Sequence, residues 1–379
     1  MISKAIDKLK SYNFKKFDLF LIILCISISY LGMMFIKSAN ESKVANQRFG
    51  LILGLVGMLI IAMISYNFWL KFYWVMYAFA IVSLLFVRLF GDSGGGARRW
   101  FEIGGFRFQP SEIVKILLIL FYAQFIMKHK DNINTVRMVV ICVLLIIPPF
   151  YLIFDQPDLS TSIMVLLIFG VMMFTGGLSW KIITGAIVLC VPSFIFLLRY
   201  AMQDGVNLLG EYQKNRILAW LYPEEYASAE AYQTLNAITA IGSGQLTGKG
   251  LNNNVIASVK NGNFISEAHT DFIFAIVGEE MGFMGCCLVI GLLFLIAIRC
   301  AVIARDAKDM AGKIIGAGMS GLIGFQTFIN IGVVTGLLPN TGLPLPFVSY
   351  GQTSLVSLLF GIGFVLNVRL QTPNFMWKE

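Results

Sequence analysis

The sequence predicts an all-α, polytopic membrane protein that crosses a lipid bilayer about ten times. Hydrophobic residues make up 57% of the 379-residue chain and charged residues only 13%, whereas soluble domains average about 25% charged residues. The mean hydropathy is +0.77. Because the apolar residues are spread along the whole chain, we expect one membrane domain over residues 1–379 rather than several soluble domains.

The individual helices follow from the lengths of the apolar runs. A hydrocarbon core of about 30 Å is crossed by roughly 20 apolar residues in a helix. That length predicts spans at residues 18–38, 48–66, 72–90, 110–128, 136–154, 160–177, 182–200, 270–298, 314–337 and 347–368. Lysines precede the first span as in a signal peptide, but its apolar run is too long for one and no small-residue cleavage site follows it. We therefore expect this helix to be retained.

Lysine and arginine near the span ends predict the orientation. With the N-terminus inside, the inner segments all carry basic residues; they are 1–17, 67–71, 129–135, 178–181, 299–313 and the tail 369–379. The short outer connections at 155–159 and 338–346 carry none. The sequence thus predicts that both termini are cytoplasmic and that residues 201–269 form a large extracellular loop between the seventh and eighth spans.

Two outer segments are too long or too polar to be simple connections. Residues 91–109 are rich in glycine, and we expect Gly94–Gly96 to act as a flexible hinge that presents Arg98 and Arg99. In the large loop, the stretch Tyr212–Tyr222 mixes apolar and basic residues and predicts an amphipathic helix at the membrane interface. Any chemistry should therefore lie on the outer side.

Several functional classes are not favoured. The net charge of +8 comes from basic residues between apolar runs, a pattern typical of topology signals rather than of a nucleic-acid-binding face. The six cysteines form no CxxC pair and have no partnering histidines, so we expect neither a disulfide framework nor a zinc site. The stretch 242–250 resembles a nucleotide-binding loop, but Gly250 replaces the required Ser or Thr.

The first candidate for chemistry is the charged pair Glu112 and Lys115, which follows Pro110 at the start of the fourth span. Three residues apart, the two side chains share one helix face. A charge inside a span costs ~2.5–3.5 kcal/mol or more, so such residues usually pair and face the protein interior. Two interpretations remain open at this point, a structural ion pair and the wall of a polar cavity.

The second candidate is Asp271, where the large loop meets the eighth span. Partial loss of solvent there would raise its pKa toward values suited to a general base. Spacing alone favours a plainer role, a helix N-cap or first-turn acid. Glu279 and Glu280 lie two turns deeper, and we expect one of them to face the same interior.

The third candidate is the stretch 330–351, in which three prolines and several glycines interrupt the helical pattern at the outer edge. Irregular backbone at that depth is tolerated only where it is buried in protein or lines a cavity. A rigid turn explains the prolines. It does not explain the polar Ser349-Tyr350-Gly351 before the last helix.

Six strings together resemble the SEDS family of bacterial cell-wall proteins, which comprises RodA, FtsW and SpoVE. They are Gly96–Trp100, Gln109–Lys115, Gln156–Leu159, Glu267–Phe274, Gly278–Gly282 and Asn330–Tyr350, and they occur in the family's order from the third span to the last. Singly each string is weak, but six in order are a strong match. Tyr212–Ile217, with Pro223 shortly after, looks more like RodA than FtsW. The chain departs from the family at Gln352-Thr353, Ser160 and Asn340.

The resemblance implies a peptidoglycan glycosyltransferase that polymerises lipid II, the undecaprenyl-diphosphate-linked disaccharide pentapeptide, on the outer face of the bacterial cytoplasmic membrane. The family's essential aspartate falls on Asp271, which reverses the preference from spacing and assigns it as the catalytic base. The predicted substrate-binding residues are Arg98, Arg99, Glu112, Lys115, Glu267, His269 and Ser349. The two arginines are candidates for the leaving diphosphate. A divalent cation, Mg²⁺ or Mn²⁺, could share that task, although no ligand cluster is evident.

The resemblance also implies a class B penicillin-binding protein as partner, together with other elongation or division proteins, and no nucleic acid. Two alternatives to the enzyme stay open. A flippase for lipid-linked precursors would suit the intramembrane charges and broken backbone, although the two halves show no convincing inverted repeat. A non-catalytic scaffold for the transpeptidase is the other alternative.

Overall fold

The computed structural model describes residues 16–94, 97–103, 106–202, 211–228, 231–251, 264–265 and 268–372. The helices, in chain order, are α2 (Leu19–Ala39), α3 (Val44–Met63), α4 (Tyr66–Leu70), α5 (Tyr73–Phe90), α6 (Pro110–Lys128), α7 (Val136–Asp155), α8 (Leu159–Thr175), α9 (Trp180–Ala201), α10 (Glu211–Leu221), α11 (Tyr232–Ser243), α12 (Ile273–Arg305), α13 (Met310–Val334) and α14 (Gln352–Leu370). Two short 3-10 turns, η2 (Glu41–Lys43) and η3 (Lys130–Asn132), link helices.

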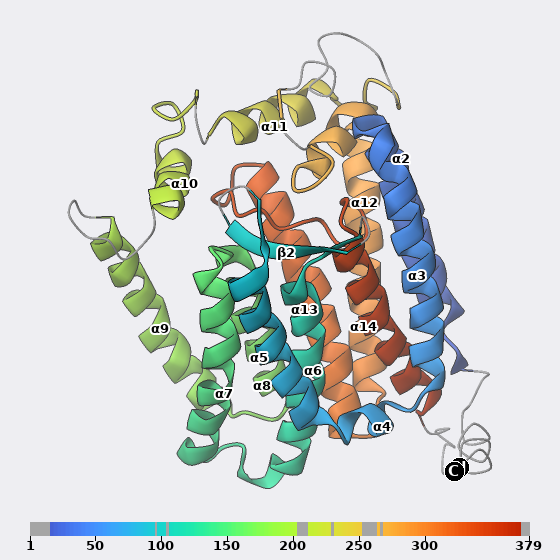
Figure 1. Cartoon of the computed structure of the whole chain (residues 1–379), viewed down its shortest axis with the longest axis vertical. Helices are drawn as coiled ribbons and strands as arrows, with labels where there is room; N and C mark the ends of the chain where they lie inside the picture. The colour runs from blue at the N-terminus through green and yellow to red at the C-terminus, as the bar shows by residue number, and fades with distance from the viewer. Residues whose placement is uncertain are drawn as a thin grey trace.

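The long helices stand side by side in one bundle (Figure 1). Eight of the described helices are long and apolar enough to cross a membrane, namely α2, α3 with its preceding turn, α5, α6, α7, α12, α13 and α14. The predicted spans at 160–177 and 182–200 coincide with α8 and α9, whose apolar stretches are shorter. The all-α membrane fold is therefore confirmed, while a total of about ten crossings stays a prediction.

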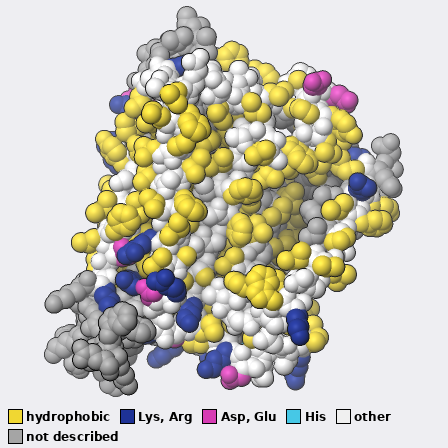
Figure 2. All heavy atoms as spheres, turned by 180° about the vertical axis from the view of Figure 1, so that it is seen from behind, with side chains coloured by type: hydrophobic (Ala, Val, Ile, Leu, Met, Phe, Trp, Pro, Cys, Tyr) yellow, Lys and Arg dark blue, Asp and Glu magenta, His cyan; other side chains and the backbone are white. Residues whose placement is uncertain are grey.

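Burial sorts the helices into centre and periphery. The apolar windows of α6 and α14 are 78% and 83% buried, whereas that of α5 is only 17% buried. α6 and α14 therefore form the middle of the bundle, and α9 stands off to one side of it (Figure 1). Apolar side chains cover much of the surface in Figure 2, and Lys and Arg gather toward the lower end, where α4 lies in Figure 1.

The two ends of the described chain meet at that same end of the bundle. Lys16 Nζ donates a hydrogen bond to the carbonyl of Thr372 at 3.4 Å. Both termini lying on one side agrees with the predicted orientation. We call this the inner end, and the opposite end, where α2 joins α3, the outer end.

The described parts of the glycine-rich outer segment form a small antiparallel sheet. Its strands are β1 (Asp92–Gly94), β2 (Ala97–Ile103) and β3 (Phe106–Phe108), in the order β1-β2-β3. Ser93 pairs with Arg98, and Phe101 pairs with Phe108. Gly95 and Gly96 lie outside the described residues, so the hinge stays a prediction, while the strands that flank them are paired.

α12 is broken near its outer end, which the hydropathy pattern did not predict. Gly282 adopts φ 62° and ψ −160°, so the helix before it and the helix after it are separate. The N–H groups of Phe283 and Met284, left over by the break, donate to the carbonyls of Gln245 and Leu246 at 2.8 and 3.2 Å. The backbone at the break is therefore satisfied by a distant loop.

That loop is the glycine-rich stretch that resembles a nucleotide-binding motif. The N–H groups of Lys249 and Gly250 donate to the carbonyls of Glu279 and Glu280 at 2.9 and 3.0 Å. Lys249 Nζ also lies 2.9 Å from a carboxylate oxygen of Glu279. Residues 244–250, which we call the clasp loop, therefore hold the outer part of α12.

Candidate functional site

Asp271 lies two residues before α12, at the outer end of the bundle, and is half-buried. The N-cap of α12 is Phe272, and no side chain caps the helix. The N-cap role that spacing favoured for Asp271 is therefore wrong. Its backbone carbonyl accepts a hydrogen bond of 2.7 Å from the side-chain amide of Asn330, which is buried on α13.

The irregular segment 335–351 passes directly beside Asp271 and is fixed by α13. Asn330 Nδ2 donates to the carbonyl of Leu343 at 2.7 Å, and Gln326 Nε2 donates to that of Pro344 at 2.9 Å. The two amides are four residues apart and so lie on one face of the helix. Leu343 and residues 345–349 are buried in protein, as irregular backbone requires at this depth.

Ser349 and His269 join the same region. The Ser349 hydroxyl donates to the carbonyl of Thr270 at 2.7 Å and accepts from the N–H of Leu345 at 2.7 Å. The N–H of Tyr350 donates to the carbonyl of His269 at 2.9 Å, and their rings are 5.4 Å apart. These contacts fix the backbone on both sides of residue 270, so Ser349 and His269 lie in the frame that positions Asp271.

Gly342 brings this segment next to the carboxylate. Its φ is +75°, and a β-carbon there would lie 3.2 Å from Asp271 Oδ2. The same β-carbon would lie 3.9 Å from Nη1 of Arg216, which comes from α10. An acid and a guanidinium thus flank one glycine at the outer end.

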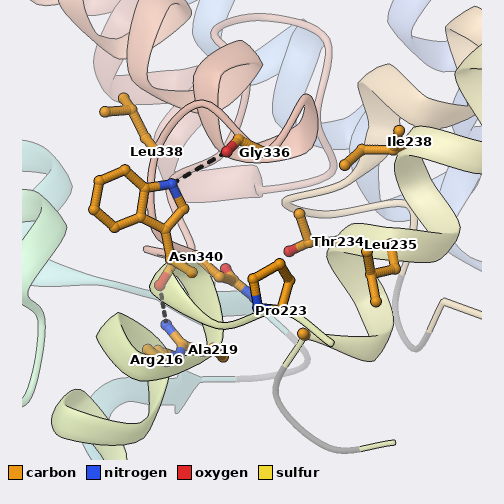
Figure 3. Close-up of a pocket in the computed structure, with 11 residues that line it drawn as sticks. Arg216, Ala219, Pro223, Thr234, Leu235, Ile238, Gly336, Leu338 and Asn340 are labelled. Atoms are coloured by element: carbon orange, nitrogen blue, oxygen red, sulfur yellow. Dashed lines mark hydrogen bonds between the residues drawn. The ribbon is translucent and has the colours of Figure 1, made fainter. Parts of the chain in front are cut away.

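Arg216 belongs to the amphipathic helix that the sequence predicted at 212–222, and α10 confirms that helix. Two contacts dock it on the irregular segment: Arg216 Nη1 donates to the carbonyl of Asn340 at 3.3 Å, and Trp220 Nε1 to that of Gly336 at 3.1 Å. Figure 3 shows both contacts at the wall of a pocket of about 100 Å³ between α10, α11 and residues 336–340. The remaining walls of the pocket are mainly apolar.

The predicted pair Glu112 and Lys115 is formed inside the bundle. Lys115 Nζ lies 2.8 Å from Glu112 Oε1, and the two side chains are 1% and 3% exposed. Lys115 Nζ also donates to Gln326 Oε1 at 3.3 Å. Because Gln326 holds Pro344, this ion pair is linked through one side chain to the segment that passes Asp271.

Arg99 is engaged elsewhere. Its Nε donates to the carbonyl of Gln156 at 2.8 Å, and its Nη2 donates to that of Pro157. Arg98 lies on β2, and its side chain is outside the described residues, as is Glu267. The arginines of the sheet are therefore not brought to Asp271 by any contact of the described residues, whereas Arg216 is close to it.

A metal site would need a group of acidic, histidine or cysteine ligands. Within the described ranges no three such side chains come together. A divalent ion stays a prediction.

What this frame can do chemically follows from its parts. A half-buried carboxylate on a fixed backbone can accept a proton from a hydroxyl group. A guanidinium close by can bind an anion. The sequence identified the carboxylate but not its neighbours Gly342 and Arg216, because their position depends on how α10 and the irregular segment dock.

Comparison with known proteins bears on this site. The sequence pattern of the FtsW, RodA and SpoVE family of cell cycle proteins matches residues 11–374. The peptidoglycan glycosyltransferase MrdB of Escherichia coli K12 is 35% identical over 352 residues, which cover 92% of this chain and 91% of MrdB. A probable peptidoglycan glycosyltransferase FtsW of Geobacter metallireducens is 32% identical, covering 95% of this chain and 96% of its own.

Solved structures agree with the sequence matches. A chain from a peptidoglycan synthase complex that coordinates polymerization and crosslinking superposes with a TM-score of 0.76 at 29% identity, covering 94% of this chain and 97% of that one. The rod-shape-determining protein RodA of Thermus thermophilus superposes with a TM-score of 0.69 at 26% identity, covering 95% and 97%. Both matches extend over nearly the whole bundle.

Proposed function

Because the chain belongs to the FtsW, RodA and SpoVE family of cell cycle proteins, we propose that it is a peptidoglycan glycosyltransferase that uses Asp271 as its catalytic base. It is a multi-pass protein of a bacterial membrane. Its substrate is lipid II, and its product is a glycan strand on the outer face. The RodA role in cell elongation is the branch that the residues at 212–217 favour.

In the proposed reaction, the carboxylate of Asp271 takes the proton of the acceptor 4-hydroxyl. The oxygen then forms a bond to the anomeric carbon of the lipid-linked donor, and the bond from that carbon to the diphosphate oxygen breaks. The configuration at the carbon inverts, and undecaprenyl diphosphate leaves with the bonding electron pair. General-base help is worth roughly 10²–10⁴ in rate, so the rest of the barrier must be lowered by positioning and by charge stabilisation.

The observation that supports this role is the fixed surroundings of Asp271. Asn330 holds its carbonyl, Ser349 holds the preceding carbonyl, and Gly342 leaves room beside its carboxylate. A base that must reach one hydroxyl benefits from such a fixed backbone, since a misplacement of about 1 Å can cost on the order of 10² in rate.

The test is lipid II polymerisation by the purified protein. We expect Asp271→Asn and Asp271→Ala to fold normally and to form no glycan strands, because neither side chain can take up the proton. Asp306→Asn, a charge-matched change at the inner end, should polymerise at the wild-type rate. Polymerisation by Asp271→Ala at the wild-type rate would rule out the proposed base.

The same protein in liposomes separates the enzyme from a flippase. An enzyme forms polymer from lipid II supplied on one face, whereas a flippase moves labelled lipid II across the bilayer without polymer. Transport without polymer, unaffected by Asp271→Ala, would favour the flippase. An inactive protein with Asp271 dispensable in cells would favour the scaffold.

We also propose a class B penicillin-binding protein as partner. Support comes from the similarity to a chain of a complex that couples polymerization to crosslinking. Co-purification with such a transpeptidase, and a higher polymerisation rate of the pair than of the single chain, are the expected results. Adding Mg²⁺ or Mn²⁺ to both samples tests the divalent cation, which would act by neutralising diphosphate charge.

A further inference from the structure

We propose that Arg216 of α10 binds the diphosphate leaving group of the lipid-linked donor, close to the carboxylate of Asp271. The inference rests on the proposed function, because it names the group that completes the site around the catalytic base. Of the substrate-binding residues expected from the sequence, none whose side chain the structure describes is shown in this place.

Arg216 lies close to the carboxylate of Asp271. A β-carbon at Gly342 would lie 3.2 Å from Asp271 Oδ2 and 3.9 Å from Arg216 Nη1. Because both distances start from one point, Asp271 Oδ2 and Arg216 Nη1 are no farther than about 7 Å apart. The guanidinium is therefore close enough to the carboxylate for both to contact one bound substrate.

The charge of the leaving group favours a cation at this place. When the bond from the anomeric carbon to the diphosphate breaks, the departing oxygen gains a negative charge. Groups aimed at the atom where charge develops lower the barrier most. A guanidinium suits this task because it stays charged and its planar N–H fork matches phosphate oxygens.

Hydrogen bonds hold Arg216 and its helix in place. The hydrogen bond to the Asn340 carbonyl orients the guanidinium, and the Trp220 contact with Gly336 fixes the helix one turn further along. The cation is therefore placed before substrate binds, which reduces the entropy lost on binding. Both contacts are made to the segment that passes Asp271, so acid and cation share one rigid frame.

Arg216 also lines the pocket between α10 and α11. Beside the guanidinium it offers Trp220, Pro223, Leu235, Ile238 and Leu338 as mainly apolar walls (Figure 3). A polyprenyl diphosphate joins a charged head directly to an apolar chain. A cation with an apolar space next to it fits that junction.

The experiment measures binding, which needs no turnover. Farnesyl diphosphate is the probe, added to the full-length protein in detergent, and its affinity is measured by calorimetry. We expect Arg216→Gln to weaken binding by roughly 10–100-fold, the loss typical of hydrogen bonds to a charged group. Arg216→Lys should fall between, because a point charge replaces the fork.

Lys214→Gln is the matched control. It removes one positive charge from the same helix, two positions away and hence on another side of it. It should leave affinity within about twofold, as expected of a surface charge screened by salt. Thermal unfolding of each variant verifies that α10 remains folded.

Three results would overturn the inference: binding by Arg216→Gln at wild-type affinity, an equal loss in Lys214→Gln, or equal affinity of the wild type for neutral farnesol. The proposed function fails separately. If the wild type binds the diphosphate through Arg216 but forms no polymer from lipid II, the anion site stands and the polymerase does not.

Discussion

Replacing Gly342 by alanine tests whether the space beside Asp271 matters for catalysis. The substitution has two effects that can be calculated from the structure. A residue with a β-carbon at φ +75° is strained by ~1–2 kcal/mol. In addition, the new carbon would lie 3.2 Å from Asp271 Oδ2, so the carboxylate must shift by a few tenths of an ångström.

Gly250→Ala separates these effects. Gly250 has φ +94°, and a β-carbon there would meet no atom within 4 Å. It therefore carries the backbone strain without the contact. We expect both variants to lose similar stability, by ~1–2 kcal/mol each, in thermal unfolding followed by tryptophan fluorescence.

Polymerisation rates should differ. Since a misplacement of about 1 Å costs on the order of 10² in rate, a shift of a few tenths should lower the rate constant of Gly342→Ala by several-fold to about tenfold. Gly250→Ala should retain the wild-type rate. The reasoning is refuted if both variants lose activity equally, or if Gly342→Ala polymerises normally while being as strained as its control.

Two further predictions concern buried and exposed charges. Lys115→Met leaves the carboxylate of Glu112 buried without its cation, so the variant should lose ~3–5 kcal/mol of stability, whereas Glu112→Leu combined with Lys115→Met should recover most of that loss. Thermal unfolding in detergent gives the order of stabilities. A double variant less stable than the single one would contradict the pairing. At the inner end, partial burial acts to raise the pKa of Asp306, but two neighbouring arginines outweigh it and hold that pKa below 3.8. The ionised carboxylate therefore stabilises the fold above that pH, and this contribution is lost as the pH falls through the lowered pKa. The stability difference between wild type and Asp306→Asn should vanish in strong acid. A difference that persists there would contradict the assignment.

Apolar run length predicted the bounds of some helices well, both central and peripheral. The predicted span 110–128 coincides with α6, and 72–90 differs from α5 by one residue. These boundaries are set locally, by Pro110 at one end and by charged or glycine residues at the others. Hydropathy carries that information within the chain segment itself.

The features that were missed depend on distant partners. The break at Gly282 lies within an apolar run, and the groups that stabilise it come from residues 245–250. The sheet at 92–108 consists of strands as short as three residues, which carry too little pattern to predict. The placement of Arg216 beside Asp271 depends on where α10 docks.

The sequence predicted the residues of the candidate site only in part. Spacing suggested the Glu112–Lys115 pair, since three residues on a helix bring two side chains together. Spacing could not assign Asp271, because a first-turn acid and a catalytic base look alike in one sequence. Their surroundings differ, and these are set by Asn330 and Ser349, some sixty and eighty positions further along the chain.

The clasp loop has a consequence for biogenesis. Most of α12 beyond Gly282 can form as it enters the bilayer, because apart from the N–H groups of Phe283 and Met284 its hydrogen bonds are its own. At the break, those two N–H groups and the carbonyls of Glu279 and Glu280 pair instead with residues 245–250. The loop lies earlier in the chain than the segment it holds, so these contacts form only after both have reached the outer end. Maturation of the outer end therefore includes a docking step that is distinct from helix insertion.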